Sequence, residues 1–262
     1  MFASARRWAR GLARAIVPPP YRAKARQIYN RATWWLYAGR RYACPCCDGR
    51  FRRFRIHKTE AGRREEMCPK CGAFGRHRVD WLFIRDQVGL PRNDSKLRLL
   101  HVAPEHALEQ RLAEHPNVIY LSADLESATA MERMDVTDIR HEDNSFGAII
   151  CNHVLEHVPD DRKAMRELYR VLEPGGWALL QTPMDRDHER TLEDPSVTDP
   201  AERVRLFGQH DHVRLYGRDY KDRLEEAGFS VTVEPYAKTL PDEIVTGQRL
   251  DLDEEIYLCR KH

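Results

Sequence analysis

Residues Phe146–Pro183 read FGAIICNHVLEHVPDDRKAMRELYRVLEPGGWALLQTP, and this stretch decides which fold the sequence predicts. The apolar run Ala148–Cys151 is typical of a buried strand, and the segment after it has apolar residues at helical spacing. Pro-Gly-Gly at 174–176 then ends the helix, and a second apolar strand follows at Trp177–Gln181. The stretch therefore predicts a strand–helix–strand unit with a turn that glycine forms easily.

The C-terminal two thirds of the chain alternates in the same way. Strands are expected near 97–102, 117–122, 147–151, 177–182, 229–235 and 255–260, and helices near 105–114, 160–172 and 217–227. This alternation is typical of a parallel sheet with crossover helices. With 262 residues, 42% apolar and 32% charged, the chain is long enough for one large domain and a small one. We expect the α/β domain to cover 81–262.

The motif VLEHV…RVLEPGG, between Val154 and Gly176, resembles the middle of the class I S-adenosylmethionine (SAM) methyltransferases. The resemblance covers roughly 97–260. It implies a doubly wound, mostly parallel seven-stranded sheet of the Rossmann-like methyltransferase type, whose last two strands form an antiparallel pair. It also implies SAM as the cofactor and methyl transfer to an oxygen or nitrogen nucleophile.

The loop after the first strand departs from this family, in which the strand ends in an acid and a glycine-rich loop follows. Here His101 stands in the place of the acid, and Ala103-Pro104-Glu105 replaces the glycines. Ala103 is small enough for close approach of the cofactor, and Glu105 could bind the SAM ammonium group instead of the missing acid. The alternative is an ordinary strand–helix junction with Glu105 as a charge at the helix start.

Two acids and an amide complete the set that the resemblance implies for SAM. Asp124, followed by Leu125, ends the second strand at the position where an acid binds ribose hydroxyls. Asp135 with Val136 corresponds to the family segment that binds the adenine amino group and ring. Asn152 follows the fourth strand, at the sheet edge that faces the ligand. The alternative for Asp124 is an ordinary acid at the start of a loop.

His153 is the first candidate for proton transfer in catalysis. His153, Glu156 and His157 fall at i, i+3 and i+4, so they could share a helical face. A metal at this triplet is disfavoured, because zinc and similar metals usually have more ligands than it offers. Packing and capping are the alternative roles for these residues.

Residues 184–216 form a polar insertion with the second candidate, His210-Asp211-His212. Asp211 beside His212 would fix the imidazole tautomer and raise its basicity, so His212 could act as a general base. An anion-friendly patch is predicted from Arg203, Arg205, His210, His212 and Arg214, with Glu193, Asp194 and Asp211 to orient it. Long polar loops at this edge of a sheet often bind or cover substrate, and a solvated surface loop is the alternative.

The cysteines predict a small zinc-ribbon-like module over 43–80. Cys44, Cys47, Cys68 and Cys71 give the spacing C-x2-C-x20-C-x2-C, which suits a structural Zn²⁺ ion with four thiolate ligands. Cys46 is expected to be free, because the 44/47 pairing fits a CxxC knuckle better. Chance clustering of reduced core cysteines is the alternative.

The N-terminal arm, residues 1–42, contains ten Lys or Arg and no acid. Trp8, Leu12 and Ile16 recur at helical spacing between arginines, so contact with an anionic membrane surface is one interpretation. Nucleic-acid contact, an organelle transit peptide and a solvated extension are the others. The chain has no run of 18 apolar residues, and we expect a cytoplasmic protein, peripheral to a membrane if the arm binds lipid.

The favoured function is therefore methyl transfer to a small-molecule, glycan or lipid-like acceptor. Residues 1–64 carry a local charge of +15, which leaves −13 for the rest, and this asymmetry favours an anionic or membrane-linked acceptor. Two alternatives come from other classes of protein. One is an inactive methyltransferase-like binding module, because the first loop is degenerate. The other is a zinc-ribbon nucleic-acid-binding protein, which is disfavoured because no stacking platform is evident and the main domain is acidic.

Overall fold

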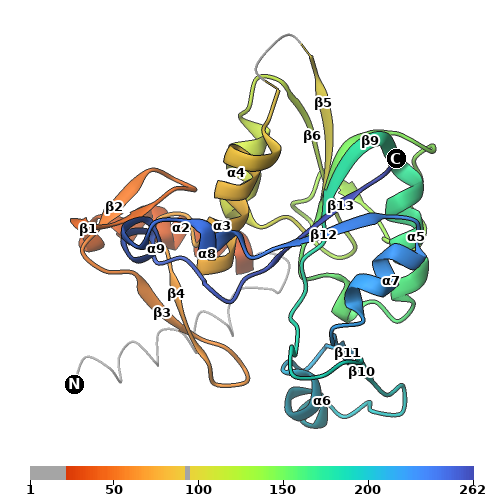
Figure 1. Ribbon diagram of the computed structural model, residues 1–262. Coiled ribbons are helices and arrows are strands. Elements are labelled where there is room, and N and C mark those ends of the chain that lie inside the picture. The colour runs from red at the N-terminus through yellow and green to blue at the C-terminus, as the bar shows by residue number, and fades with distance from the viewer. Residues whose placement is uncertain (1–21, 92–94) are drawn as a thin grey trace.

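The computed structural model describes residues 22–91 and 95–262 (Figure 1). The amphipathic stretch with Trp8, Leu12 and Ile16 lies outside the described residues. Among the residues described, no helix combines the length and the apolar character that crossing a bilayer requires.

A seven-stranded sheet forms the centre of the molecule, with the strand order β12-β13-β9-β8-β5-β6-β7. The strands are β5 (Leu97–Val102), β6 (Val118–Asp124), β7 (Glu132–Arg133), β8 (Phe146–Cys151), β9 (Leu172–Leu179), β12 (Ser230–Glu234) and β13 (Ile256–Arg260). Strands β5 to β9 pair in parallel, while β13 is antiparallel to both β9 and β12. The expected mostly parallel sheet with a final antiparallel pair is confirmed.

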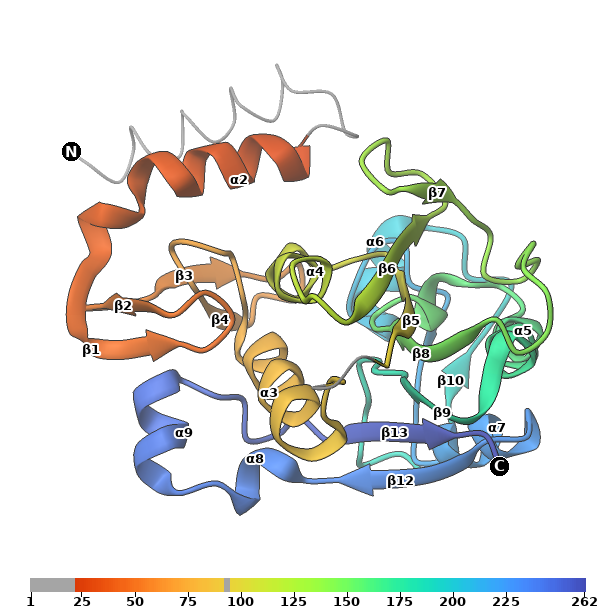
Figure 2. The same cartoon turned by 90° about the horizontal axis from the view of Figure 1, so that it is seen from above.

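Helices cover both faces of this sheet (Figure 2). The larger helices are α3 (Gly75–Phe83), α4 (His106–Ala113), α5 (Asp161–Val171) and α7 (Tyr220–Glu226). Successive side chains of β8 alternate between two cores: Ala148 and Ile150 pack with α3 and α4, while Ile149 and Cys151 pack with α5 and α7. All four are fully buried, which explains why β8 reads as a continuous apolar run.

The predicted break at Pro-Gly-Gly is wrong in its placement. Helix α5 ends at Val171 and β9 begins at Leu172, so the three residues lie within the strand. The β8–β9 register shifts between Phe146 and Ala148, and Gly175 has φ +79°. Glycine adopts this left-handed conformation at little cost, so the strand bulges here instead of starting here.

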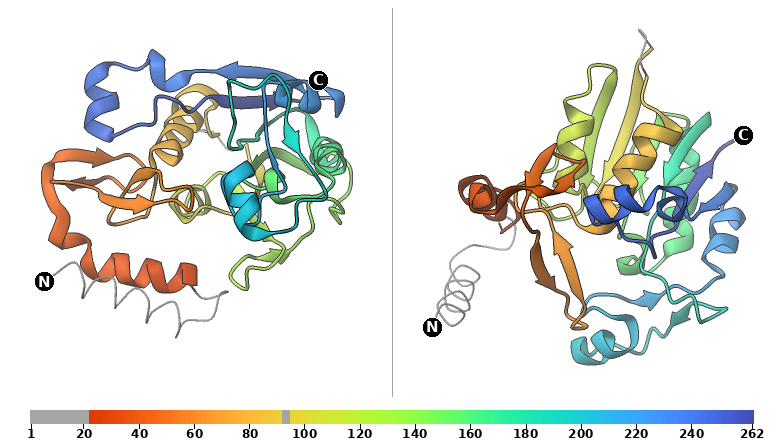
Figure 3. Two further views of the ribbon diagram at one scale, coloured as in Figure 1. Left: turned by 90° about the horizontal axis from the view of Figure 1, so that it is seen from below. Right: turned by 60° about the vertical axis from the view of Figure 1, so that its left-hand side comes forward.

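The N-terminal part forms a unit beside the sheet and shares one hydrophobic core with it (Figure 3). It contains α2 (Arg22–Thr33), the 3-10 turn η2 (Trp34–Tyr37) and two antiparallel hairpins, β1 (Ala38–Cys44) with β2 (Gly49–Phe51) and β3 (Arg55–Lys58) with β4 (Arg64–Met67). The chain then enters α3 and the π-helical turn η3 (Ile84–Val88) before β5. Helix α3 therefore joins this unit to the sheet and packs on the sheet itself.

The insertion 184–216 contains β10 (Leu192–Glu193), α6 (Pro200–Phe207) and β11 (Arg214–Leu215). Arg214 is 4% exposed and donates to the carbonyls of Leu155 (2.8 Å), Val158 and Pro159 (2.8 Å). Its Nε lies 3.0 Å from a carboxylate oxygen of Glu193. The prediction of Arg214 as part of an open anion-binding patch is therefore wrong, because its donors already bind the turn after β8.

The remaining short elements are the 3-10 turn η4 (Leu155–His157), α8 (Tyr236–Thr239) and α9 (Asp242–Gln248). The first follows β8, and the other two lie between β12 and β13 and reach back to the N-terminal unit (Figure 1).

Replacing Arg214 should strongly destabilise the protein. Arg214→Met leaves the three carbonyls without their buried donor and Glu193 with Arg223 alone, so we expect a loss of about 3–5 kcal/mol in the free energy of unfolding. Arg205→Met is the matched control in the same insertion, since Arg205 is exposed and pairs only with Glu202 in the described chain; it should cost less than about 0.5 kcal/mol. Urea denaturation measures both, and equal losses would contradict the anchoring role.

Candidate functional site

The carboxyl ends of β5, β6, β8 and β9 meet at one edge of the sheet, where ligands bind in open α/β sheets. Most of the residues predicted to bind SAM lie there. Each follows directly from its strand, so the sheet fixes their relative positions.

The loop after β5 is organised by a pair of side chains. His101 is fully buried; its Nε2 lies 2.7 Å from Glu105 Oε2 and its Nδ1 lies 3.0 Å from the hydroxyl of Tyr120. Ala103 has φ +48°, a left-handed conformation that glycine usually occupies. Glu105 is the N-cap residue of α4, but within the described chain its side chain makes no capping bond. The carboxylate therefore belongs to the loop rather than to the helix.

Glu105 is ionised at neutral pH. Burial disfavours its charged form, but the hydrogen bond from His101 and the charge of that imidazole outweigh burial and lower the pKa of Glu105 to about 2. Burial lowers the pKa of His77 to about 3, so this imidazole is neutral. An anionic carboxylate thus lies at the carboxyl edge of the sheet.

Asn152 and His153 come from the end of β8 and are tied to the end of β9. Gln181 N donates to Asn152 Oδ1 (3.2 Å), and His153 N donates to Gln181 O (2.8 Å). His153 has φ +55°, so it stands outside the helical turn that was predicted to carry it. Its Nδ1 still lies 3.6 Å from Glu156 Oε1, and Thr182 Oγ1 donates to the other oxygen of Glu156 (3.2 Å).

Four buried polar atoms in this region have no hydrogen-bond partner among the described residues. They are Glu105 Oε1, Asn152 Nδ2, His153 Nε2 and Asp80 Oδ1. The carboxylates offer acceptors and the amide offers a donor, so a ligand that carries both kinds of group would satisfy them. Asp80 was missed by the sequence reasoning; the available signal was a lone acid within the apolar segment VDWLF at 79–83.

Asp124 and Asp135 lie on the loops after β6 and β7. Asp124 Oδ1 accepts from the backbone of Glu126 (2.8 Å) and Ser127 (2.7 Å), and Asp135 Oδ1 accepts from both the N and the Oγ1 of Thr137 (2.8 Å each). The bonds from Thr137 lower the pKa of Asp135.

Exposed apolar side chains accompany these two acids. Leu125 is 50% exposed and Met131 is 66% exposed, whereas Val136 is buried. The carboxyl edge therefore presents apolar surface beside Asp124.

In the predicted His210-Asp211-His212 group, His210 Nδ1 lies 3.8 Å from Asp211 Oδ1, but His212 has another partner. His212 is buried and its Nδ1 lies 2.9 Å from the carbonyl of Phe207, so this carbonyl, and not Asp211, sets its tautomer. Burial lowers the pKa of His212. Asp211 Oδ2 instead lies 3.4 Å from His157 Nδ1, and the His157 and His212 rings are 4.7 Å apart. His210 contacts Glu60 of the β3–β4 loop at 2.9 Å.

The four predicted metal-ligating cysteines converge. The Sγ atoms of Cys44, Cys47, Cys68 and Cys71 all lie within 4.8 Å of one another, with 3.6 Å between Cys44 and Cys71 and 3.7 Å between Cys47 and Cys68. Hydrogen bonds with the other three thiols lower the pKa of Cys47, while the neighbouring thiols and burial raise the pKa of Cys44, Cys68 and Cys71. Cys46 is not one of these four sulfurs, and its Sγ lies 3.5 Å from the carbonyl of His77.

Arg111 of α4 contacts the first knuckle, a contact that sequence reasoning missed. Its guanidinium donates to the carbonyls of Cys46 (2.7 Å) and Pro45 (3.3 Å) and pairs with Asp48. Lys70 donates to the carbonyl of Cys47 (3.2 Å). The cysteine cluster is thus attached to a helix of the sheet domain as well as to α3.

The fold and the polar carboxyl edge define a Rossmann-like α/β domain of the nucleotide-binding type. A model of the family described as "Methyltransferase domain" matches residues 106–234. The solved structure of the [4+2]-cyclase SpnF has the same fold, with a TM-score of 0.50 and 14% sequence identity over 94% of this chain and 97% of that one. Residues 106–234 therefore match a methyltransferase domain, on a sheet with the Rossmann-like topology expected of class I SAM-dependent methyltransferases.

Curated relatives cover only part of this chain. A ubiquinone biosynthesis O-methyltransferase of Albidiferax ferrireducens is 33% identical over 34% of this chain and 30% of its own length. The 27-O-demethylrifamycin SV methyltransferase of Amycolatopsis mediterranei is 27% identical over 47% of this chain and 43% of its own length. The chain spans about a third of the length of the first curated relatives it matches.

Proposed function

We propose that this protein is a SAM-dependent methyltransferase that acts on an oxygen or nitrogen nucleophile. The observation that carries the proposal is the group of unpartnered acceptors and donors at the carboxyl edge. The amino-acid end of SAM carries an ammonium and a carboxylate, so it would satisfy both kinds of atom. Glu105 would take the ammonium, and Asn152 Nδ2 would donate to the carboxylate.

The other predicted residues fit the rest of the cofactor. Ala103 leaves room for close approach, Asp124 with Leu125 would meet the ribose, and Asp135 with Val136 would meet the adenine. The cofactor supplies an electrophilic methyl group on a sulfonium. The chain itself positions the two reactants, which is the main contribution of an enzyme to such a transfer.

His153 is the proposed general base for a hydroxyl acceptor. Its Nδ1 faces Glu156, and its Nε2 is buried without a partner among the described residues. Burial works against ionisation of Glu156, but the bond and charge of His153 outweigh it and lower the pKa of Glu156. A carboxylate behind the imidazole would support proton transfer to Nε2. His212 and Asp211 remain candidates for proton transfer from the methyl acceptor. Asp211 would act through His157.

The acceptor is proposed to be anionic or membrane-linked. Ile28, Tyr29, Trp35 and Leu36 of α2 and η2 are between 47% and 62% exposed. The exposed basic residues beside them in sequence are Arg26, Arg31, Arg40 and Arg41. Exposed aromatic and aliphatic groups with flanking arginines suit the interface of an anionic bilayer.

The cysteine cluster is proposed to hold a structural Zn²⁺. Four thiols at mutual distances below 4.8 Å suit a closed tetrahedral site, which leaves no position for substrate. The ion would stabilise the two knuckles and the start of α3 rather than take part in chemistry.

Titration calorimetry with S-adenosylhomocysteine (SAH) tests cofactor binding. Glu105→Gln removes the charge that faces the ammonium, so the affinity should fall by about 10- to 100-fold. Glu109→Gln on the same helix should bind as the wild type does. Failure of the wild type to bind SAH or SAM would instead favour the inactive binding module.

Sedimentation with vesicles tests membrane contact. We expect the full chain to bind phosphatidylglycerol-containing vesicles, with affinity falling as salt rises, and the double variant Trp35→Ser/Leu36→Ser to bind at least about tenfold more weakly. Ile119→Ser is the matched control, since Ile119 is equally exposed but lies on β6. Equal binding by both variants would refute the proposal, and tighter binding to RNA than to vesicles would favour the nucleic-acid alternative.

Metal analysis tests the zinc site. Purified protein should contain about one zinc per chain, as four thiolates around one ion require. Cys68→Ser should lose the zinc and lower the free energy of unfolding by more than about 4 kcal/mol, as expected for loss of a structural metal. Cys46→Ser should keep the zinc and the free energy of unfolding of the wild type. A wild-type protein without zinc after growth in zinc-replete medium would contradict the site.

A further inference from the structure

Asp80 is a buried acid that the proposed chemistry has not yet used. It is 1% exposed, and its Oδ1 has no hydrogen-bond partner among the described residues. A buried carboxylate without a partner destabilises a protein, so its presence calls for an explanation. Helix α3, which carries it, begins four residues after the last cysteine of the cluster.

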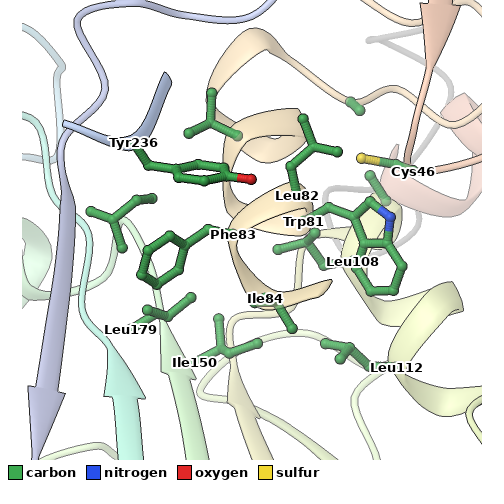
Figure 4. Packing of buried hydrophobic residues seen from close by; sticks show 14 of the residues in the cluster. Cys46, Trp81, Leu82, Phe83, Ile84, Leu108, Leu112, Ile150, Leu179 and Tyr236 are labelled. Carbon is green, nitrogen blue, oxygen red and sulfur yellow. The ribbon is translucent and has the colours of Figure 1, made fainter. Parts of the chain in front are cut away.

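The position of Asp80 on α3 directs it to the carboxyl edge of the sheet. Phe83 and Ile84 follow at i+3 and i+4, on the same helix face, and pack with Ile150 and Leu179 of the sheet (Figure 4). Glu105, which follows the end of β5, is one of the charges that act on Asp80, so this turn of α3 lies near the carboxyl edge. The face that is apolar at Phe83 therefore becomes polar one turn earlier, at Asp80.

Acids from two other elements surround this carboxyl group. Glu105 lies at the start of α4, and Glu254 precedes β13, where Gln181 Nε2 holds its Oε1 at 3.1 Å. Burial, with the charges of Glu254 and Glu105, raises the pKa of Asp80, and the opposing charge of Arg76 does not offset them. Without a cation nearby, the protonated form of Asp80 is favoured.

The imidazoles of this region do not supply that cation to Asp80. His101 is engaged with Glu105, and His153 faces Glu156. His77, one turn before Asp80, is neutral because burial lowers its pKa. The titratable and charged groups that face Asp80 are therefore Glu105, Arg76 and Glu254, and burial raises the pKa of Glu254 as well.

We propose that Asp80 is a second carboxylate for the cationic end of the methyl donor, opposite Glu105. The inference rests on the proposed SAM binding and extends the binding site to a helix of the cysteine-containing unit. When the cation enters, Asp80 gives its proton to solvent and stays behind as the carboxylate partner. The O–H bond of Asp80 breaks, water or buffer takes up the proton, and the positive charge of the bound cation replaces the charge of that proton.

Calorimetry of SAM and SAH binding in two buffers of different ionisation enthalpy tests the proposal. The observed binding enthalpy is plotted against the ionisation enthalpy of the buffer. The slope of this plot gives the number of protons released when the ligand binds. Asp80→Asn should weaken binding by about 10- to 100-fold and reduce the protons released by up to one. A larger effect on SAM than on SAH would assign Asp80 to the sulfonium, and an equal effect would assign it to the ammonium. Asp86→Asn, on η3 and paired with Arg85, is the matched control.

Thermal unfolding gives a second measurement that a structural role would not reproduce. An acid with a raised folded-state pKa makes the fold less stable as pH rises from about 3.9 towards the folded-state value. Asp80→Asn removes this pH-dependent loss of stability. The midpoint temperature of thermal unfolding of this variant at neutral pH should therefore lie above that of the wild type. Unchanged affinity and proton release in Asp80→Asn, with normal wild-type binding, would overturn this inference alone. Absence of wild-type binding would overturn the proposed function as well.

Discussion

Burial of the parallel sheet on both faces is the constraint on which the rest of the structure depends. Because β8 sends alternate apolar side chains into two cores, each face needs its own layer of helices. On one face, part of that layer is α3, which arrives from the cysteine-containing unit. The N-terminal unit is therefore part of the core of the sheet domain, and its last helix cannot move without exposing Phe83 and Ile84.

The same constraint explains why the polar groups gather where they do. A sheet with apolar faces has room for side-chain chemistry only at its edges, and parallel strands bring all their carboxyl ends to one of them. Asn152 and Glu105 lie there because β8 and β5 end there. Burying the unpartnered atoms of these residues costs free energy, and a bound zwitterion would remove that cost.

Local pattern in the sequence predicted what depends on neighbours along the chain. The period-two and helical spacings identified β8, α5 and most of the sheet, and the cysteine spacing identified a cluster whose sulfurs do converge. The predictions that were wrong or missing concern side chains whose partners are not adjacent to them in the sequence. Asp211 is next to His212 in the sequence but does not orient the His212 imidazole. The Nδ1 atom of that ring is instead hydrogen-bonded to the carbonyl of Phe207. Asp80 gave little local signal, because its importance comes from Glu105 and Glu254, which no spacing connects to it.

The cysteine cluster and the carboxyl edge are consequently joined by one rigid path. Cys68 N donates to Ala73 O (2.8 Å), which also accepts from Arg78 Nη1 (2.7 Å), and Cys46 Sγ lies against the carbonyl of His77. These contacts hold the first turn of α3, and Asp80 follows one turn later. A metal ion that orders the two CxxC knuckles would therefore also fix the position of Asp80 relative to the sheet. In this arrangement the cluster would act on the proposed site only through the position of α3, with no ligand of its own in the chemistry.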